Sequence, residues 1–297
     1  MNKADIYFKN NIRKILEFGT WDEDPRPRYK SDGAPAFSKY ITMVNEEYDL
    51  SKGQFPITTL RPIAFDNGIK ETQWIYQDQT NSLEVLEQKY GIMWWRDWEV
   101  KFDYESTEEI MAELGLYPPA EGTIGQRYGA TVKRYDMMNR LLKGLKENPF
   151  GRRNIINLLQ EADLQETPGL VPCAFQIMLT PRRMPDGLYL DMSLTQRGSD
   201  YLVAGHINKM QYVALQMMVA HEVGMKIGKF GHYVQNLHIY ERHLEQAEEL
   251  LRRPTAHHEA KFILNAEGKS FYEIEARDFQ LLDYNPTKPQ LKFDLGI

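Results

Sequence analysis

The chain has 297 residues, enough to bury a large core, and no linker-like stretch divides it, so we expect one domain over residues 1–297. Its net charge of −6 argues against a general surface for nucleic acids or anionic membranes. The single cysteine, Cys173, excludes an internal disulfide and a zinc–thiolate cluster. Neither a secretion signal nor an apolar run of about 18 residues is present, so we expect a soluble, cytoplasmic protein.

The first part of the chain predicts two helices separated by a loop. Residues 5–18 carry apolar side chains at helical spacing, and Gly19 follows as a stop. Residues 22–35 are rich in proline, glycine and charge, and predict an exposed loop whose cations are either solvated or bind an anion. Residues 65–77 predict the second helix. Glu71 lies at the edge of its apolar stripe, where burial would raise the carboxyl pKa; a partly exposed surface glutamate is the alternative.

Two segments in the middle of the chain have unusual compositions. Residues 94–98 hold three of the five tryptophans, which could pack in the core; alternatively, Trp95 and Trp98 could form the wall of a site for a flat aromatic ligand. Residues 122–129 are rich in glycine but lack the lysine of a phosphate-binding loop and the spacing of a dinucleotide-binding turn. We therefore expect a structured loop that presents Tyr128.

The second half alternates between helix and strand patterns. We expect helices at 135–146, 208–223 and 241–253, and strands at 154–159, 188–195 and 229–240. His238 and Tyr240 fall on one face of the last strand, where they are either a structural pair or a grip for a sugar hydroxyl. The apolar C-terminus, ending at Ile297, predicts that the tail docks on the domain.

Cys173 is the residue around which we expect the chemistry to be organised. A lone cysteine between apolar neighbours is commonly a small buried hydrophobe. Pro172, however, suits the start or a bulge of a strand, where the next side chain can be directed into a cleft. The pairs Arg152-Arg153 and Gln196-Arg197 would favour the thiolate if they lay close in space. These features favour a nucleophile at a strand entrance.

Seven short motifs occur in an order and spacing that, with Arg26 and Ile297, span nearly the whole chain. They are Lys70-Glu71, Tyr128-Gly129, Arg152-Arg153, Pro172-Cys173, Gln196-Arg197, Asp200 with Asn208, and His238-x-Tyr240. Together they resemble the folate-dependent, cysteine-nucleophile family of thymidylate synthases. The resemblance implies an α+β fold with a large twisted mixed β-sheet, helices packed on one face, and a homodimer in which two sheets pack face to face.

The resemblance also implies a reaction, the reductive methylation of dUMP to dTMP. The one-carbon unit and the hydride come from 5,10-methylenetetrahydrofolate, a consumed cosubstrate, and no metal takes part. Cys173 would add to carbon 6 of uracil and turn the ring into an enolate that attacks the one-carbon unit. Glu71, with ordered water, would transfer protons, and Tyr128 would assist removal of the carbon 5 proton. Asn208 would read the uracil edge, provided that neighbouring groups fix the orientation of its amide.

The ligand contacts implied by the resemblance fall into two sets. The dUMP set, in which the second subunit supplies Arg152 and Arg153 to the phosphate, consists of Arg26, Arg152, Arg153, Gln196, Arg197, Asp200, Asn208, His238 and Tyr240. The folate set consists of Trp95, Trp98, Leu170, Asp200, Ala204 and Ile297.

Four positions depart from the commonest pattern of the family. Ala174 replaces a histidine, Gly198 a serine, Ala204 a glycine and Arg96 an aspartate. None of these changes removes a group that makes or breaks a bond. They leave open a dUMP hydroxymethylase of the same fold, in which water rather than hydride ends the reaction. A homologue that acts as an RNA-binding regulator is a further alternative, which the net charge argues against.

Overall fold

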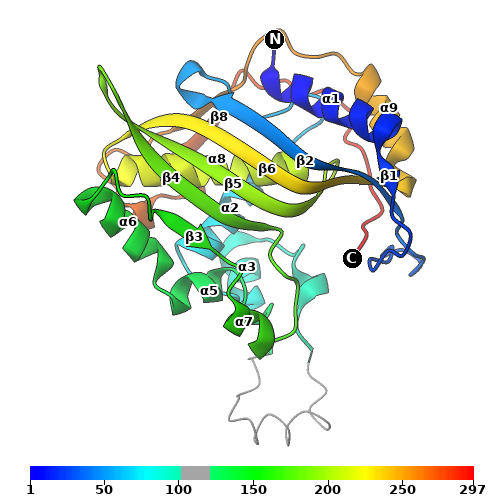
Figure 1. Ribbon diagram of the computed structural model, residues 1–297, viewed down its shortest axis with the longest axis horizontal. Helices are drawn as coiled ribbons and strands as arrows, with labels where there is room; N and C mark the ends of the chain where they lie inside the picture. The colour runs from blue at the N-terminus through cyan, green and yellow to red at the C-terminus, as the bar shows by residue number, and fades with distance from the viewer. Residues whose placement is uncertain (102–120) are drawn as a thin grey trace, which may run out of the picture.

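The computed structural model describes residues 1–101 and 121–297. Its main feature is a six-stranded sheet with the order β1-β2-β6-β5-β4-β3 (Figure 1). Neighbouring strands are antiparallel except for β5 and β6, which are parallel and therefore need a crossover connection, supplied by helix α8. The strands are β1 Thr20–Trp21, β2 Ser38–Asp49, β3 Ile155–Asn157, β4 Ala174–Met184, β5 Gly187–Asp200 and β6 Lys226–Tyr240, with a separate pair of β7 Lys261–Leu264 and β8 Phe279–Leu282.

Helix α1 precedes the first strand, and the other helices lie in the connections between the strands. In the described parts of the chain the α-helices are α1 Lys3–Phe18, α2 Phe65–Tyr76, α3 Leu83–Tyr90, α5 Gly129–Arg134, α6 Met137–Glu147, α7 Glu161–Glu166, α8 Gly205–Glu222 and α9 Leu244–Arg252. The short 3-10 helices are η1 Leu50–Lys52, η2 Arg96–Trp98, η3 Glu241–His243, η4 Phe271–Glu273 and η5 Ala276–Asp278.

The two faces of the sheet differ in burial. Tyr48 of β2 pairs with Phe230 of β6, which pairs with Met192 of β5, so the three side chains lie on one face, and all are buried. Their chain neighbours Glu47 and Lys229 point to the opposite face and are exposed or half-buried. Helices α2 and α8 pack on the buried face (Figure 1). The expected arrangement, with helices on one face of a large mixed sheet, is therefore confirmed.

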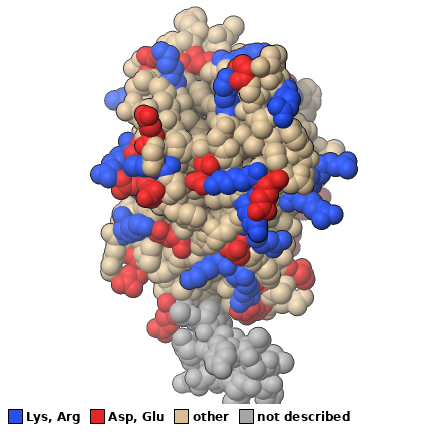
Figure 2. Space-filling view, turned by 90° about the vertical axis from the view of Figure 1, so that its left-hand side faces the viewer, with Lys and Arg blue, Asp and Glu red and all other residues tan. Residues whose placement is uncertain are grey.

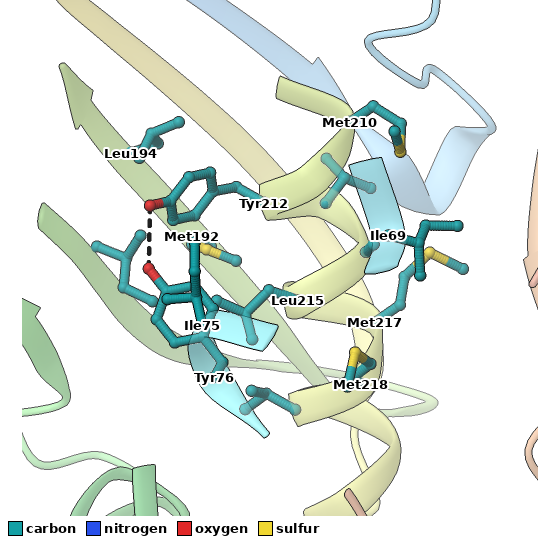
Figure 3. Close-up of a cluster of buried hydrophobic side chains, with 14 of the residues drawn as sticks. Ile69, Ile75, Tyr76, Met192, Leu194, Met210, Tyr212, Leu215, Met217 and Met218 are labelled. Carbon is teal, nitrogen blue, oxygen red and sulfur yellow. Dashed lines mark hydrogen bonds between the residues drawn. The ribbon is translucent and has the colours of Figure 1, made fainter. Parts of the chain in front are cut away.

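Helix α8 lies at the centre of the core, as its apolar sequence predicted. Figure 3 shows Met210, Leu215 and Met218 of this helix packed beside Ile69 and Ile75 of α2. Burying each such side chain contributes about 1.5–3 kcal/mol. The contact between α2 and α8 brings Glu71 and Asn208, which are 137 positions apart in the sequence, to the same region.

A buried ion pair fixes the start of α8 against the sheet. Lys209 Nζ lies 2.6 Å from Glu46 Oε2 of β2, and both side chains are 2% exposed. Tyr48 and Tyr201 also donate hydrogen bonds to this carboxylate. Burial alone would raise the pKa of Glu46, but Lys209, His232 and Tyr48 together outweigh it and the net shift is downward. Removing one partner of such a pair costs about 3–5 kcal/mol, so Lys209 holds its neighbour Asn208 in place.

Most of the predicted elements are confirmed, with small changes in their ends. The helices expected at 5–18, 65–77, 135–146 and 208–223 correspond to α1, α2, α6 and α8. The expected strands correspond to β3, β5 and β6, with β5 continuing through Asp200. The helix expected at 241–253 begins as η3 and continues as α9.

The surface charge and the helices can be compared with two predictions from the sequence, that the chain has no general surface for nucleic acids and no membrane-spanning segment. In the face shown in Figure 2, basic and acidic side chains are interspersed, unlike the single-sign patch that binds polyanions. Within residues 1–101 and 121–297, no helix combines the length and the apolar character needed to cross a bilayer.

Candidate active site

Cys173 lies immediately before β4, where the pairing of β4 with β5 is irregular between Ala174 and Gln176. This agrees with the prediction that Pro172 places Cys173 at the start or a bulge of a strand. The Cys173 backbone N–H donates to the Tyr128 hydroxyl at 3.4 Å. The Arg197 guanidinium donates to the carbonyl oxygens of residues 171 and 172 at 2.6 and 3.1 Å, so this cation is held beside the loop that carries the thiol.

Burial raises the pKa of the Cys173 thiol, and the charges of Arg197 and Arg26 only partly oppose this. Arg197 therefore favours the thiolate, as predicted, but desolvation outweighs this Coulombic attraction and the net shift of the pKa is upward. Arg152 and Arg153 are exposed in the turn between α6 and β3. Without ligands, the thiol is mainly protonated at neutral pH.

Glu71 of α2 is buried, with 9% of its surface exposed. Trp95 Nε1 donates to its Oε1 at 2.7 Å, and Trp94 Nε1 donates to its Oε2 at 3.1 Å. Gln211 Nε2 also donates to Oε2, at 3.0 Å. Burial raises the pKa of Glu71 to about 7 despite these three donors, which confirms the expected shift. A carboxyl that titrates near neutrality can both give and take a proton.

Tyr128 is presented by a strained turn. Its φ of 49° and ψ of −112° are rare for a residue with a side chain, and such a conformation costs about 1–3 kcal/mol. A Cβ atom at the next residue, Gly129, would overlap the backbone of Thr80, so only glycine fits there. The Tyr128 ring packs edge-on against Trp95 with 5.0 Å between the ring centroids, which places its hydroxyl beside Cys173. The predicted loop presenting Tyr128 is confirmed.

Asn208 belongs to a chain of hydrogen-bonded side chains. Its Oδ1 accepts from Gln196 Nε2 at 3.2 Å, and its Nδ2 donates to Gln211 Oε1 at 3.0 Å. Gln196 Oε1 is bonded in turn to Nε2 of the buried His232, and Gln211 Nε2 is bonded to Glu71. Four elements, α2, α8, β5 and β6, thus contribute to one polar path inside the core.

Two hydrogen-bonded tyrosines, Tyr76 and Tyr212, lie beside the backbone carbonyl of Ala174. Figure 3 shows the hydroxyl groups of Tyr76 and Tyr212 bonded to each other, with 2.9 Å between the oxygens. Tyr212 also donates to the Ala174 carbonyl at 3.1 Å. These contacts hold the backbone next to Cys173 although residue 174 has no polar side chain.

One cavity brings the acid–base groups and the thiol together. Its lining includes five of the site residues predicted from the sequence, namely Cys173, Glu71, Trp95, Tyr128 and Asn208. Other lining residues were not predicted from the sequence, and these are Thr72, Ile75, Tyr76, Gln211 and Tyr212. The polar interruptions of the apolar helix 208–223, at positions 208 and 211 on one face, are the signal that could have revealed Gln211.

The residues predicted to bind the sugar, His238 and Tyr240, lie at the end of β6, close to the C-terminal tail. The His238 and Tyr240 rings are in edge contact at 5.2 Å, and burial lowers the pKa of His238 to about 4, so it is neutral. The backbone of Ile297 exchanges two hydrogen bonds with Arg28, both at 2.8 Å, which confirms that the tail docks. Arg26 is exposed, and its charge lowers the pKa of both Cys173 and Tyr240 against the larger effect of burial.

The residues assigned to folate lie in four segments, one of which is the docked tail at Ile297. Trp95 is buried and in edge contact with the half-buried Trp98 at 5.6 Å, and Leu170 is half-buried in the loop before Cys173. Ala204 is the N-cap of α8, and burial raises the pKa of Asp200, at the end of β5, to about 7. Within the described ranges, no three His, Cys, Asp or Glu side chains are grouped so that they could hold a metal ion.

A thiol and a near-neutral carboxyl that share one cavity define a class of protein, an enzyme that pairs a covalent nucleophile with a general acid–base group. The family model described as thymidylate synthase matches residues 6–297. The chain belongs to this family.

Relatives and a solved structure agree with this assignment. The chain is 54% identical to a thymidylate synthase of Streptococcus suis and 55% identical to one of Streptococcus mutans, each over 298 residues and 100% of both chains. It also resembles the solved structure of thermostable thymidylate synthase A from Bacillus subtilis, with a TM-score of 0.84, 26% identity and 99% coverage of both chains. These names support a synthase rather than a hydroxymethylase or an RNA-binding regulator.

Proposed function

We propose that this chain carries out the reaction of its family, the conversion of dUMP and methylenetetrahydrofolate to dTMP and dihydrofolate, in the cytoplasm. The observation that carries the proposal is the single cavity shared by Cys173, Glu71, Tyr128 and Asn208. A nucleophile, a proton-transfer group and a group that can read a pyrimidine edge are the parts that this chemistry requires.

Cys173 begins the reaction by adding to carbon 6 of the uracil ring. The new S–C bond moves electron density to carbon 5 and O4, and the enolate formed can attack the one-carbon unit. The folate supplies that unit and later the hydride that reduces it to a methyl group. Expulsion of the thiolate at the end restores the double bond of the ring. The raised pKa of the resting thiol means that a proton must leave as dUMP binds.

Glu71 and Tyr128 handle the protons of this sequence. Glu71, with a pKa of about 7, can protonate the nitrogen of the leaving folate and recover the proton later, with water as the carrier. The Tyr128 hydroxyl, which lies beside the Cys173 backbone, orients the water that removes the carbon 5 proton. Burial and the nearby charges raise the pKa of Tyr128 well above its ordinary value, so it stays neutral and acts by hydrogen bonding.

The phosphate of dUMP is held by arginines from two copies of the chain. Arg197 and Arg26 act on the thiol from one copy. Arg152 and Arg153 are exposed, and they come from the partner in a homodimer whose sheets pack face to face. The half-exposed outer face of the sheet supports this arrangement, because the helices of the same chain cover the other face.

The remaining contacts position the nucleoside and the folate. Asn208 bonds the uracil edge and Gln196 supports it, while His238 and Tyr240 bind the deoxyribose hydroxyl. Trp98 and Leu170 pack on the folate ring system together with Trp95. Asp200 and Ala204 lie at the adjoining end of α8, and the tail at Ile297 closes over both ligands.

The test is to incubate the purified protein with dUMP and methylenetetrahydrofolate and to quantify both products. We expect dTMP and dihydrofolate in equal amounts, since each methyl group takes its hydride from one folate. Formation of 5-hydroxymethyl-dUMP without dihydrofolate would contradict the proposal and indicate the hydroxymethylase.

A further inference from the structure

The amide of Asn208 can select a base only if its oxygen and nitrogen cannot exchange places. Uracil presents a donor at N3 and an acceptor at O4, whereas cytosine presents an acceptor at N3 and a donor at N4. An asparagine whose amide rotates by half a turn would therefore suit cytosine. In the structure, a chain of hydrogen-bonded side chains that begins at Glu71 prevents this rotation.

Glu71 is the end of this chain at which the direction of the hydrogen bonds is fixed. Its two oxygens accept from Trp95 and Trp94, whose indole N–H groups can only donate. An ionised carboxylate accepts only, so Gln211 must present its NH₂ group to it, as it does at 3.0 Å. A second bond from Gln211 Nε2 to the Gly68 carbonyl at 3.3 Å demands the same orientation, and it does so even when Glu71, with its pKa of about 7, carries a proton. The carbonyl of Gln211 must then point the other way.

That carbonyl faces Asn208. Because Gln211 Oε1 is an acceptor, Asn208 has to present Nδ2, and the distance between the two atoms is 3.0 Å. Asn208 Oδ1 then meets Gln196 Nε2 at 3.2 Å. If the Asn208 amide alone rotated by half a turn, its carbonyl would face the carbonyl of Gln211 and its NH₂ group would face the NH₂ group of Gln196, so both hydrogen bonds would be lost. Each atom of the amide keeps one unused bonding direction, and Asn208 is half-buried at the cavity.

The other end of the path does not fix the orientation by itself. Gln196 Oε1 is bonded to His232 Nε2, and His232 Nδ1, which is buried, has no hydrogen-bond partner among the residues that the structure describes. A neutral imidazole can carry its proton on either nitrogen, so His232 could serve Gln196 in both orientations. The direction of the whole path is therefore determined at Glu71 and transmitted by Gln211.

We propose that Gln211 is a positioning residue for base selection, which transmits the acceptor character of Glu71 to Asn208 and so makes the site prefer uracil to cytosine. This inference rests on the proposed function. It adds a residue that touches neither the reacting atoms nor, in our assignment, the base.

The test compares Gln211→Met with a matched control, Gln216→Met. Methionine has a similar length and helix propensity but none of the amide's hydrogen bonds. Gln216 is also buried on α8, yet it donates only to the backbone carbonyls of Leu190 and Lys229. For each variant, kcat/KM for dUMP and the dissociation constants of dUMP and dCMP are measured, together with thermal unfolding.

We expect Gln211→Met to lower the preference for dUMP over dCMP by about tenfold or more, as expected when a polar group loses its fixed partner. Gln216→Met should lose stability and keep the preference. Gln211→Glu should keep most of it, because two adjacent carboxyls share one proton, and the protonated one donates to its neighbour while its carbonyl accepts from Asn208. If Gln211→Met does not fold, Gln211→Ala, with the strongest helix former, replaces it.

Two results would overturn the inference. One is a Gln211→Met protein that forms dTMP with the base preference of the parent. The other is an equal loss of preference in Gln216→Met, which would indicate a general loosening of α8. A parent protein that forms no dTMP would instead contradict the proposed function, so the two failures are distinguishable.

Discussion

Replacing Trp95 with phenylalanine should move the ionisation of Glu71 to higher pH. The Trp95 N–H donates to Glu71 Oε1 at 2.7 Å and stabilises the ionised carboxylate more strongly than the protonated form. Burial already raises the pKa of Glu71 to about 7, and the three donors limit that rise. Phenylalanine keeps an aromatic ring beside Tyr128 but cannot donate, so the ionised form loses one stabilising contact and the pKa rises.

The size of the shift follows from the strength of the lost bond. A hydrogen bond to a charged group contributes about 1.5–3 kcal/mol, and one pKa unit corresponds to about 1.4 kcal/mol. The expected shift is therefore about one to two units. The lower value applies because Trp94 and Gln211 still donate to Oε2 and can adjust. The Glu71 pKa should then be about 8.

The assay is the pH dependence of kcat/KM for dUMP, which reports ionisations of the free enzyme. Trp74→Phe is the control, because Trp74 belongs to the same aromatic cluster at 6.0 Å from Trp95 but donates its N–H to the Ser82 carbonyl. The Glu71 limb of the profile should move up by about one unit in Trp95→Phe only. An unmoved limb, or an equal movement in Trp74→Phe, would refute the reasoning.

Three further predictions concern the nucleophile, the dimer and the base. Cys173→Ala should fold and bind dUMP but form no dTMP, because it lacks the S–C bond; turnover above background would exclude Cys173 as the nucleophile. Mixing inactive Cys173→Ala and Arg152→Glu subunits should restore partial activity, since one site of the heterodimer is intact; no recovery after confirmed subunit exchange would place Arg152 in its own subunit's site. Asn208→Asp should lower kcat/KM for dUMP by about tenfold and raise the relative use of dCMP, and unchanged kinetics would show that another residue reads the base.

Local patterns in the sequence predicted the elements whose burial is regular. Strand β5 alternates between buried and more exposed residues and α2 has an apolar stripe, whereas α8 is apolar on every side and is buried at every position from 209 to 220. Strand β2 escaped prediction because a charged residue, Glu46, occupies a core position, and its partner Lys209 is 163 residues away. The full length of strand β4 was not predicted either, because Pro181 and the two arginines that follow it are unusual in a strand inside a sheet.

The site was predictable in its residue types and less so in its electrostatics. The position of Glu71 at the edge of an apolar stripe was enough to expect a raised pKa, because burial dominates that shift. For Cys173, the sequence revealed the arginines but not the depth of the thiol, and depth decides the direction. The orientation of Asn208 depends on Gln211 of its own helix, and Gln211 is oriented in turn by Glu71, 140 positions away in the sequence, a contact that no local pattern encodes.

The raised pKa of Cys173 limits how the reaction can begin. Each unit of increase reduces the thiolate fraction about tenfold, whereas the intrinsic reactivity of the thiolate rises only about threefold. A higher pKa is therefore a net disadvantage unless ligand binding itself promotes loss of the proton. The arginines that favour the thiolate, Arg197 and Arg26, also bind the phosphate dianion in our proposal, so dUMP weakens their effect on the thiol. The driving force must then come from the bond to carbon 6, which consumes the thiolate as it forms, with the proton passing to the water and carboxyl of the same cavity.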